Sequence, residues 1–192
     1  MVRIDLLQTE RRCKMKKLFV FVGDGSSGKT TLIAELAERH PNKFRKVVTR
    51  TSRSMRTGEV DGEDYHFLPR AYFVGNPELV LVKETDRGDY YGTKKADLFL
   101  STHHLLLTSR PTGVLKLFAL GFRNIVVVRI EICEALKIAR MRQRGDSEEV
   151  ISERLKSDIS TSMEADFADA LIIELNASQS LDEKVGSILK AC

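Results

Sequence analysis

The chain has 192 residues, of which 42% are hydrophobic, and its formal net charge is +4. This length suits one α/β core with small insertions and is too short for two large domains. Every apolar run is far shorter than the roughly 20 residues of a membrane-spanning helix, so we expect a soluble globular protein and no membrane partner.

The positive charge is concentrated in the N-terminal segment. Residues 1–17 hold six basic and two acidic residues, which leaves 25 of each sign in the rest of the chain. Because the rest of the chain has no net charge, the overall charge of the protein does not indicate a nucleic-acid partner. We interpret residues 1–16 as a basic extension, with disorder as one reading, and residues 17–192 as the folded domain. The extension lacks the apolar core of a secretory signal, Asp5 and Glu10 count against an amphipathic targeting segment, and Met15 offers an alternative start.

The cysteines and histidines suggest no disulfide framework and no metal centre. Cys13, Cys133 and Cys192 are widely separated and odd in number, which is typical of free thiols in a reducing compartment. The four histidines do not have the spacing of metal ligands. We therefore expect a cytoplasmic protein.

The first predicted element is a strand at Leu18–Val22, and the residues after it read Gly-Asp-Gly-Ser-Ser-Gly-Lys-Thr. This sequence fits Gly-x-x-x-x-Gly-Lys-Thr between a strand and a helix, which is the context of a phosphate loop. Backbone N–H groups of such a loop cradle phosphate oxygens, and the helix N-terminus adds partial positive charge. Lys29 would reach the outer phosphates, and Thr30 would offer its hydroxyl to Mg²⁺. We therefore predict binding of a nucleoside triphosphate with Mg²⁺ through Gly23, Gly25, Ser26, Ser27, Gly28, Lys29, Thr30 and Thr31.

The rest of the chain alternates between predicted helices and strands. Apolar periodicity predicts helices at about 30–39, 93–104, 111–120, 131–144, 147–163 and 181–189. It predicts further strands at about 47–49, 65–68, 79–84, 105–108, 124–130 and 170–175. Strands that alternate with helices imply a mostly parallel sheet that is covered on both faces.

A long polar loop after Val48 carries a second candidate site. Arg53 and Arg56 lie close together in it, and an arginine fork binds phosphate with two hydrogen bonds. Tyr65 and Tyr91 would add phenol donors. The loop therefore suits a phosphorylated acceptor, although a solvated basic loop explains the arginines equally well.

Two further features call for a chemical or a structural explanation. Glu84 ends an apolar strand, where a carboxylate is unexpected unless it points into a cavity. Arg140 and Arg144 share one helix face, and Arg154 lies on the next helix across Gly145. Arginines on a closing flap would stabilise a phosphoryl group in transfer. An exposed, salt-bridged helix pair is compatible with the same spacing.

Three of these segments resemble the guanylate kinase family. Residues 48–67 are similar to its nucleotide-acceptor segment, Tyr90-Tyr91-Gly92-Thr93 resembles its Tyr-Tyr-Gly-Ser/Thr, and residues 144–151 with Arg154 resemble its lid. With the phosphate loop, the similarity runs in order from about Lys17 to the C-terminus. The resemblance implies a P-loop α/β three-layer sandwich with about five parallel core strands, an acceptor-binding insertion at about 50–91 and a lid at about 140–154.

The resemblance also implies an activity, namely ATP-dependent phosphorylation of a nucleoside monophosphate, above all GMP or dGMP. The catalytic residues would be Lys29, Arg53, Arg140, Arg144 and Arg154. The acceptor phosphate would be held by Arg53, Arg56, Tyr65 and Tyr91. Glu84 would accept hydrogen bonds from the guanine N1 and exocyclic amine, with Thr49 and Thr93 contacting the base. ATP, GMP and Mg²⁺ would be the ligands of a monomer or homodimer.

The sequence departs from the family near the acceptor. The family carries Asp-x-Asp at the end of the strand after the Tyr-Tyr-Gly segment, whereas this chain reads Thr108-Ser109-Arg110, and the stretch between Glu84 and Tyr90 is about two residues short. A kinase for another phosphorylated molecule, such as ribose 1,5-bisphosphate, is therefore an alternative. A non-catalytic interaction module is another, although it would predict a degraded phosphate loop. A GTPase switch lacks support, because the chain has no Asn-Lys-x-Asp guanine motif.

Overall fold

The computed structural model describes residues 16–85, 88–99, 101–159, 167 and 170–192. The predicted extension at 1–16 lies outside these residues except for Lys16, and so does Cys13. Each helix within the described ranges is too short or too polar to cross a bilayer.

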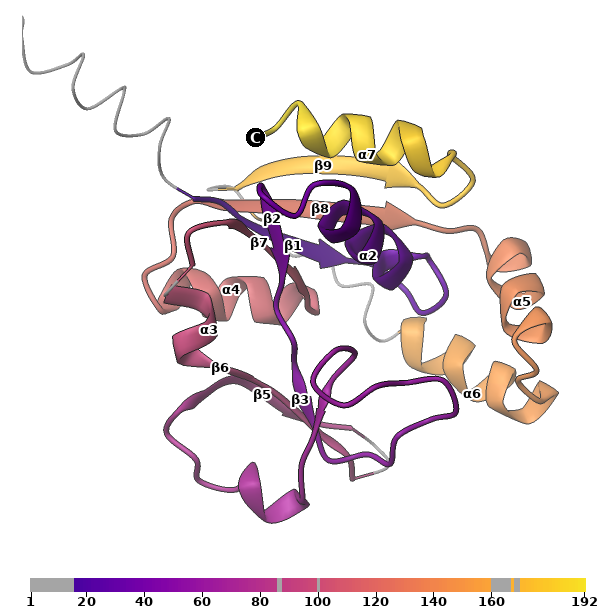
Figure 1. Cartoon of the computed structure of the whole chain (residues 1–192). Helices are drawn as coiled ribbons and strands as arrows, with labels where there is room; N and C mark the ends of the chain where they lie inside the picture. Colours follow the sequence, from indigo (N-terminus) through magenta and orange to yellow (C-terminus); the bar gives the residue numbers. More distant parts are fainter. Residues whose placement is uncertain (1–15, 86–87, 100, 160–166, 168–169) are drawn as a thin grey trace, which may run out of the picture.

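A five-stranded parallel sheet forms the centre of the fold (Figure 1). Its strand order is β2-β7-β1-β8-β9, so the first strand lies in the middle. The strands are β1 (Leu18–Val22), β2 (Phe44–Lys46), β7 (His104–Thr108), β8 (Ile125–Glu131) and β9 (Leu171–Asn176). Central strands of such a sheet are buried on both faces, which explains why β1 is apolar at every position.

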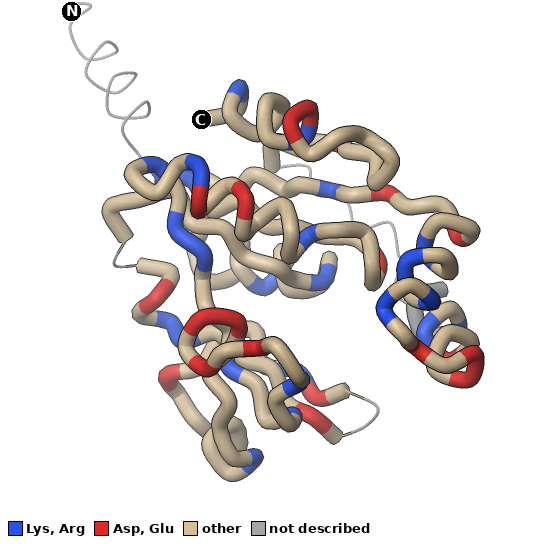
Figure 2. The backbone as a smooth tube through the Cα atoms, turned by 45° about the vertical axis from the view of Figure 1, so that its right-hand side comes forward, with Lys and Arg blue, Asp and Glu red and all other residues tan. Residues whose placement is uncertain are grey.

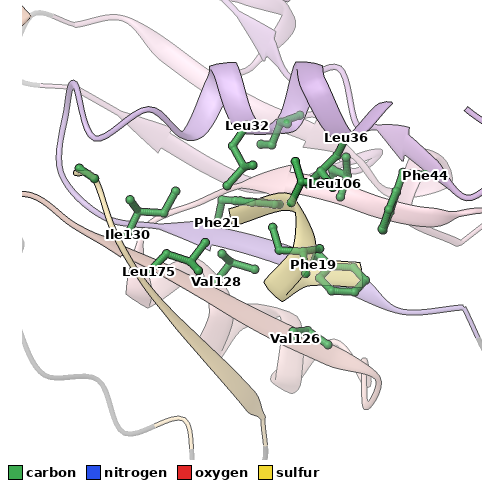
Figure 3. Close-up of a cluster of buried hydrophobic side chains, with 14 residues drawn as sticks. Phe19, Phe21, Leu32, Leu36, Phe44, Leu106, Val126, Val128, Ile130 and Leu175 are labelled. Atoms are coloured by element: carbon green, nitrogen blue, oxygen red, sulfur yellow. The ribbon is translucent and has the colours of Figure 1, made fainter. Parts of the chain in front are cut away.

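Alternate side chains of β1 contact different helix layers. Phe19 and Phe21 pack with α2 (Lys29–Arg39) and α7 (Leu181–Leu189), as the buried cluster in Figure 3 shows for α2. Leu18, Val20 and Val22 pack on the opposite face with α3 (Lys95–Phe99) and α4 (Pro111–Ala119). The parallel sheet covered on both faces, predicted from the alternation of elements, is confirmed. So is the three-layer arrangement with about five core strands that the family resemblance implies.

A second sheet lies beside the core and is built from the segment between β2 and α3 (Figure 1). Its order is β4-β3-β6-β5, and its strands are β3 (Arg50–Thr51), β4 (His66–Phe67), β5 (Leu79–Glu84) and β6 (Tyr90–Lys94), with a short 3₁₀ helix at Arg70–Tyr72. The pairing of β5 with β6 shifts between Val80 and Lys83, and Leu81 has φ of 56° there. This is a bulge, which changes the face to which the following side chains point.

Two helices extend beyond the carboxyl ends of the core strands. They are α5 (Glu134–Gln143) and α6 (Glu148–Ile159), and Gly145 joins them with φ of 83°. Figure 2 shows basic and acidic residues gathered on this pair. The pair borders the end of the sheet where the phosphate loop lies (Figure 1).

Three predicted elements differ from the structure. The predicted strand at 47–49 is wrong, because the chain leaves the core there to reach the second sheet, and the strand lies earlier, at Phe44–Lys46. The predicted helix at 93–104 is wrong in its first part, because Thr93 pairs with Val80 in the second sheet, and α3 covers only Lys95–Phe99. The helix predicted from residue 131 begins at Glu134, since β8 extends to Glu131. The end of the helix predicted to reach residue 163 lies outside the described residues.

Candidate active site

A cleft of about 830 Å³ lies between the phosphate loop and the second sheet. It is lined by the loop, by β5 and β6, by the first turn of α4 and by the end of β8. A smaller hollow of about 170 Å³ adjoins it and shares Thr49, Tyr65 and Thr108 with its lining. The phosphate loop and the polar loop that carries Arg53 and Arg56, here called the arginine loop, therefore line two adjoining spaces.

The phosphate loop has a backbone that only glycine fits at its first position. Gly23 has φ of 137°, and a Cβ atom there would lie 2.4 Å from the carbonyl oxygen of Ile130. Gly28 has φ of 94° and directly precedes α2. The loop therefore lies flush against the end of β8, with the N-terminus of α2 directed at the cleft.

The Lys29 ammonium lies over the loop itself. It donates hydrogen bonds to the carbonyl oxygens of Gly23 at 2.8 Å and Asp24 at 2.5 Å, and to Ser27 Oγ at 3.2 Å. Lys29 and Gly25 line the cleft, and Thr30 lines the smaller hollow. The lysine is thus placed beside the N–H groups that a phosphate would meet.

The hydroxyl of Ser26 is buried and has no hydrogen-bond partner among the described residues. Ser26 also has φ of 60°, a left-handed conformation that is uncommon for serine. A buried hydroxyl normally has a partner, and one without a partner in the protein fits a ligand oxygen. The loop therefore has the features that a bound triphosphate would satisfy.

The helix α5 is attached to this loop by two contacts. Lys137 Nζ donates to Asp24 Oδ2 at 2.9 Å, and Arg140 donates to the carbonyl oxygens of Ser26 and Ala177, each at 3.0 Å. Of the predicted flap arginines, Arg140 therefore lies next to the phosphate loop.

The other two flap arginines do not line the cleft. Arg144 and Arg154 both form ion pairs with Asp146, and the distance from Arg154 to Asp146 Oδ2 is 2.8 Å. Burial acts to raise the pKa of Asp146, but the hydrogen bond from Arg144 and the charge of Arg154 outweigh it, so this pKa is lowered. Arg142 forms an exposed pair with Glu148 at 2.7 Å. The structure thus contains the salt-bridged helix pair that the spacing allowed, and it brings only Arg140 to the loop.

Arg53 is buried, and its guanidinium is already paired. It donates to both carboxylate oxygens of Glu59, at 2.7 and 2.6 Å, and to the Tyr91 hydroxyl at 3.2 Å. The hydrogen bond from Arg53 lowers the pKa of Glu59 and raises that of Arg53. The Arg53 guanidinium also stacks 4.9 Å from the centre of the Tyr65 ring. Arg53 is therefore held in one orientation at the edge of the smaller hollow.

The remaining acceptor residues surround the same space. Arg56 is exposed and lines the smaller hollow with Arg53. Burial, followed by the neighbouring Tyr91, raises the pKa of the Tyr65 phenol, which stays protonated and able to donate. Thr49 and Thr93 line the main cleft. Two arginines and two phenols thus converge where the sequence predicted a phosphate site.

Glu84 is a further predicted site residue that the structure places outside the cleft. Its carboxylate is 44% exposed, accepts from Arg70 at 2.7 Å and from the Tyr90 hydroxyl at 2.9 Å, and does not line the cleft. The expectation that Glu84 points into a cavity is wrong, because the bulge in β5 turns Lys83 toward the cleft instead. Burial, and then the charge of Arg110, lower the pKa of Lys83 to about 8.

Sequence reasoning missed several residues that shape the site. They are Asp24, Glu59, Lys83, Arg110 and Lys137. Glu59 could have been found as the acidic residue that follows two arginines in one loop. Lys83 could not, because its orientation depends on the bulge, and Lys137 depends on a contact across more than a hundred residues.

Comparison with known proteins agrees with this geometry. The family model described as guanylate kinase matches residues 15–191. A guanylate kinase from Trichormus variabilis is 32% identical over 172 residues, which cover 82% of this chain and 81% of that protein. A guanylate kinase from Pseudomonas fluorescens is 31% identical, covering 86% of this chain and 83% of that protein.

Solved structures show the same fold at lower identity. A guanylate kinase from Anaplasma phagocytophilum aligns with a TM-score of 0.63 and 21% identity over 92% of this chain and 84% of that chain. A gluconokinase from Sinorhizobium meliloti aligns with a TM-score of 0.53 and 16% identity over 93% of this chain and 92% of that chain. The sequence matches and the cleft together lead to one conclusion: the chain belongs to the guanylate kinase family and is a phosphotransferase.

Proposed function

We propose that this protein transfers the γ-phosphoryl group of ATP to GMP or dGMP, giving ADP and GDP or dGDP. One observation carries the proposal: the phosphate loop and the Arg53–Arg56 hollow adjoin through the shared residues Thr49, Tyr65 and Thr108. A donor phosphate on the loop and an acceptor phosphate in the hollow would therefore face each other. An acceptor phosphate oxygen attacks the γ-phosphorus, and the bond from that phosphorus to the β–γ bridging oxygen breaks with its electron pair going to ADP.

The phosphate loop would bind the donor. Backbone N–H groups of residues 23–31 and the Ser26 hydroxyl bind the phosphate oxygens, and Lys29 turns from its carbonyl partners to the outer phosphates. Thr30 would hold Mg²⁺ with its hydroxyl, because Mg²⁺ takes few protein ligands and most of its oxygens from phosphates and water. Bound Mg²⁺ neutralises phosphate charge during transfer.

The arginine loop would hold the acceptor. Arg53 and Arg56 bind its phosphate with Tyr65 and Tyr91, within an insertion that we place at about 50–91. Because Glu59 fixes the Arg53 fork, the arginine loses little side-chain entropy when the phosphate arrives. Catalysis then depends on position and charge rather than on covalent steps.

The α5–α6 pair would act as a lid at about 140–154. Arg140 is already beside the loop, whereas Arg144 and Arg154 would exchange Asp146 for phosphate oxygens when nucleotides bind. Such arginines neutralise the migrating group and exclude water. We place this enzyme in the cytoplasm, as a monomer or homodimer without nucleic-acid or membrane partners.

A coupled assay of ADP release tests the proposal. ATP and Mg²⁺ are supplied with GMP, dGMP, AMP, CMP, UMP or ribose 1,5-bisphosphate, and the matched blanks omit the acceptor or replace Mg²⁺ with excess chelator. We expect acceptor-dependent ADP release that is fastest with GMP or dGMP and lost without Mg²⁺. ADP release that ignores the acceptor would contradict a kinase.

A further inference from the structure

The acceptor side of the cleft carries positive charge without a matching carboxylate. Lys83 and Arg110 both line the cleft, and neither side chain makes a hydrogen bond or ion pair to a described residue. The described lining contributed by β5, β6, β7 and the first turn of α4 contains no Asp or Glu. The charged side chains that a base held there would meet are therefore hydrogen-bond donors, beside the hydroxyls of Thr93, Thr108 and Ser109, which can donate or accept.

The backbone explains why these two cations share the cleft. The bulge in β5 turns Lys83 inward and leaves Glu84 outside with Arg70 and Tyr90. Arg110 directly precedes α4, and a Cβ atom on Gly113 would lie 2.0 Å from Ser109 Oγ, so this turn is tightly packed. The charge of Arg110 reaches the Lys83 ammonium, which in turn lies 5.3 Å from the centre of the Tyr91 ring. The bulge and the start of α4 thus bring the two cations to the same part of the cleft.

We propose that Lys83 and Arg110 determine acceptor specificity by donating hydrogen bonds to the O6 and N7 atoms of guanine. This inference rests on the proposed function and deepens it. Lysine and arginine read guanine through this edge because O6 and N7 are both acceptors. Adenine presents an amine in place of O6, so the same donors reject it. In this arrangement Glu84 does not contact the base and instead pairs with Arg70.

A set of acceptors separates this reading from a carboxylate that binds N1 and the 2-amino group. IMP keeps O6 and N7 but lacks that amino group, whereas 7-deaza-GMP lacks only N7. Binding is measured by titration calorimetry with the Mg²⁺ complex of a non-hydrolysable ATP analogue present, and KM is measured by ADP release. We expect the IMP values to lie within about threefold of the GMP values. We expect 7-deaza-GMP and AMP to be weaker by about 10-fold or more, the usual loss for one broken base contact.

Matched variants assign the effect to residues. Lys83→Met keeps the length of the side chain and removes its donor, so the KM for GMP should rise about 10-fold or more while the KM for ATP stays unchanged. Lys83→Arg should restore most of the loss, and Arg110→Met should resemble Lys83→Met. Glu84→Gln should change the KM for GMP less than twofold. Lys94→Met, at a lysine that pairs with Glu78 on the same sheet, controls for the substitution itself.

The outcomes separate the two levels of the proposal. Rejection of IMP together with a large loss in Glu84→Gln would overturn cationic reading while leaving a guanylate kinase. Preference for ribose 1,5-bisphosphate over GMP, lost in Lys83→Met, would overturn base reading and show that the pair binds a second phosphate. If no acceptor stimulates ADP release, the proposed function fails, and calorimetry with GMP and IMP still decides how the cleft selects its ligand.

Discussion

The donor and acceptor sides of the cleft are built from different parts of the polypeptide. The donor side is one continuous loop of eight residues whose geometry is set by the backbone, with Gly23 against Ile130 and Gly28 at the start of α2. The acceptor side is assembled from side chains on four separate segments: the arginine loop, β5, β6 and the start of α4. The donor side is thus fixed locally, and the acceptor side depends on how the second sheet pairs.

This difference suggests which side can change its ligand. A backbone cradle recognises phosphate, which every nucleotide shares, and tolerates few changes because glycine is required. Side chains on a β-sheet can be substituted while the backbone pairing of the sheet is kept. Opposite charges at Glu84 and Lys83 illustrate this, since the bulge alone decides which one lines the cleft.

The largest effect should come from the donor side. Lys29→Ala removes a charge held above the phosphates, and turnover should fall by about 10²–10³ or more, as when other charge-stabilising donors are removed. The melting temperature without nucleotide should barely change, because the glycines already shape the loop. Turnover and thermal melts check both points, with Lys94→Ala as the control. Retention of most activity would remove Lys29 from the mechanism.

A backbone test separates shape from charge on the same side. Gly23→Ala forces a Cβ atom to within 2.4 Å of the Ile130 oxygen at a φ of 137°. We expect a loss of stability of about 1–3 kcal/mol and a clear rise in the KM for ATP. Gly186→Ala lies in α7 with open space around it and should be neutral or slightly stabilising. Equal melting curves for the two variants would contradict a steric requirement at Gly23.

On the acceptor side, Arg53→Lys keeps the charge and removes the planar fork. Loss of paired hydrogen bonds to Glu59 and to phosphate should raise the KM for GMP by about 10-fold or more. The KM for ATP should stay within about twofold. The melting temperature should fall because a lysine cannot replace both of the hydrogen bonds that Arg53 donates to the Glu59 carboxylate. Steady-state kinetics with each substrate varied in turn measures the split. Parallel rises in both KM values would place Arg53 outside the acceptor site.

The low pKa of Lys83 predicts opposite responses of stability and binding to pH. Lys83 titrates at about 8 in the folded protein and at 10.5 as an ordinary lysine, so the unfolded chain holds more protons between these values. Loss of the buried charge therefore stabilises the folded protein as the pH rises through this window, whereas GMP affinity falls because the donor is lost. Arg110 and the ring of Tyr91 are the groups that face it.

The measurement compares Lys83→Met with the wild type. Urea midpoints and GMP affinities taken at pH 7.5 and 9.5 are subtracted between the two proteins, which cancels the titration of other groups. A wild type and variant with the same pH dependence of stability would show that Lys83 has an ordinary pKa.

The smallest effect is expected outside both sides of the cleft. Deleting residues 1–14 removes half of the excess positive charge and no predicted periodic element. Activity and melting temperature should remain within experimental error. A large loss of either would show that the extension contributes to the folded domain or to an oligomer.

The sequence predicted best what is set locally. The phosphate loop, α2, α7 and the alternation of the core strands follow from glycine spacing and apolar periodicity over short windows. Thr93 was assigned to a helix because its local pattern allows one, but pairing with Val80 overrides that preference. Glu84 was predicted to point into a cavity because it is a carboxylate at the end of an apolar strand, but a bulge shifts the side chains that follow it to the other face. Orientation in the second sheet is therefore a tertiary property that a local pattern does not contain.

The attachment of α5 to the phosphate loop has a consequence for local unfolding. Lys137 to Asp24 and Arg140 to Ser26 join two segments that are separated by more than a hundred residues, and Gly23 rests on the end of the strand that leads into α5. The loop cannot open without straining these bonds, so the loop and the first turns of α5 form one cooperative unit. Their backbone amides should therefore exchange hydrogen for deuterium at similar rates. The amides of α6, beyond Gly145, should exchange at rates that are independent of those of the loop.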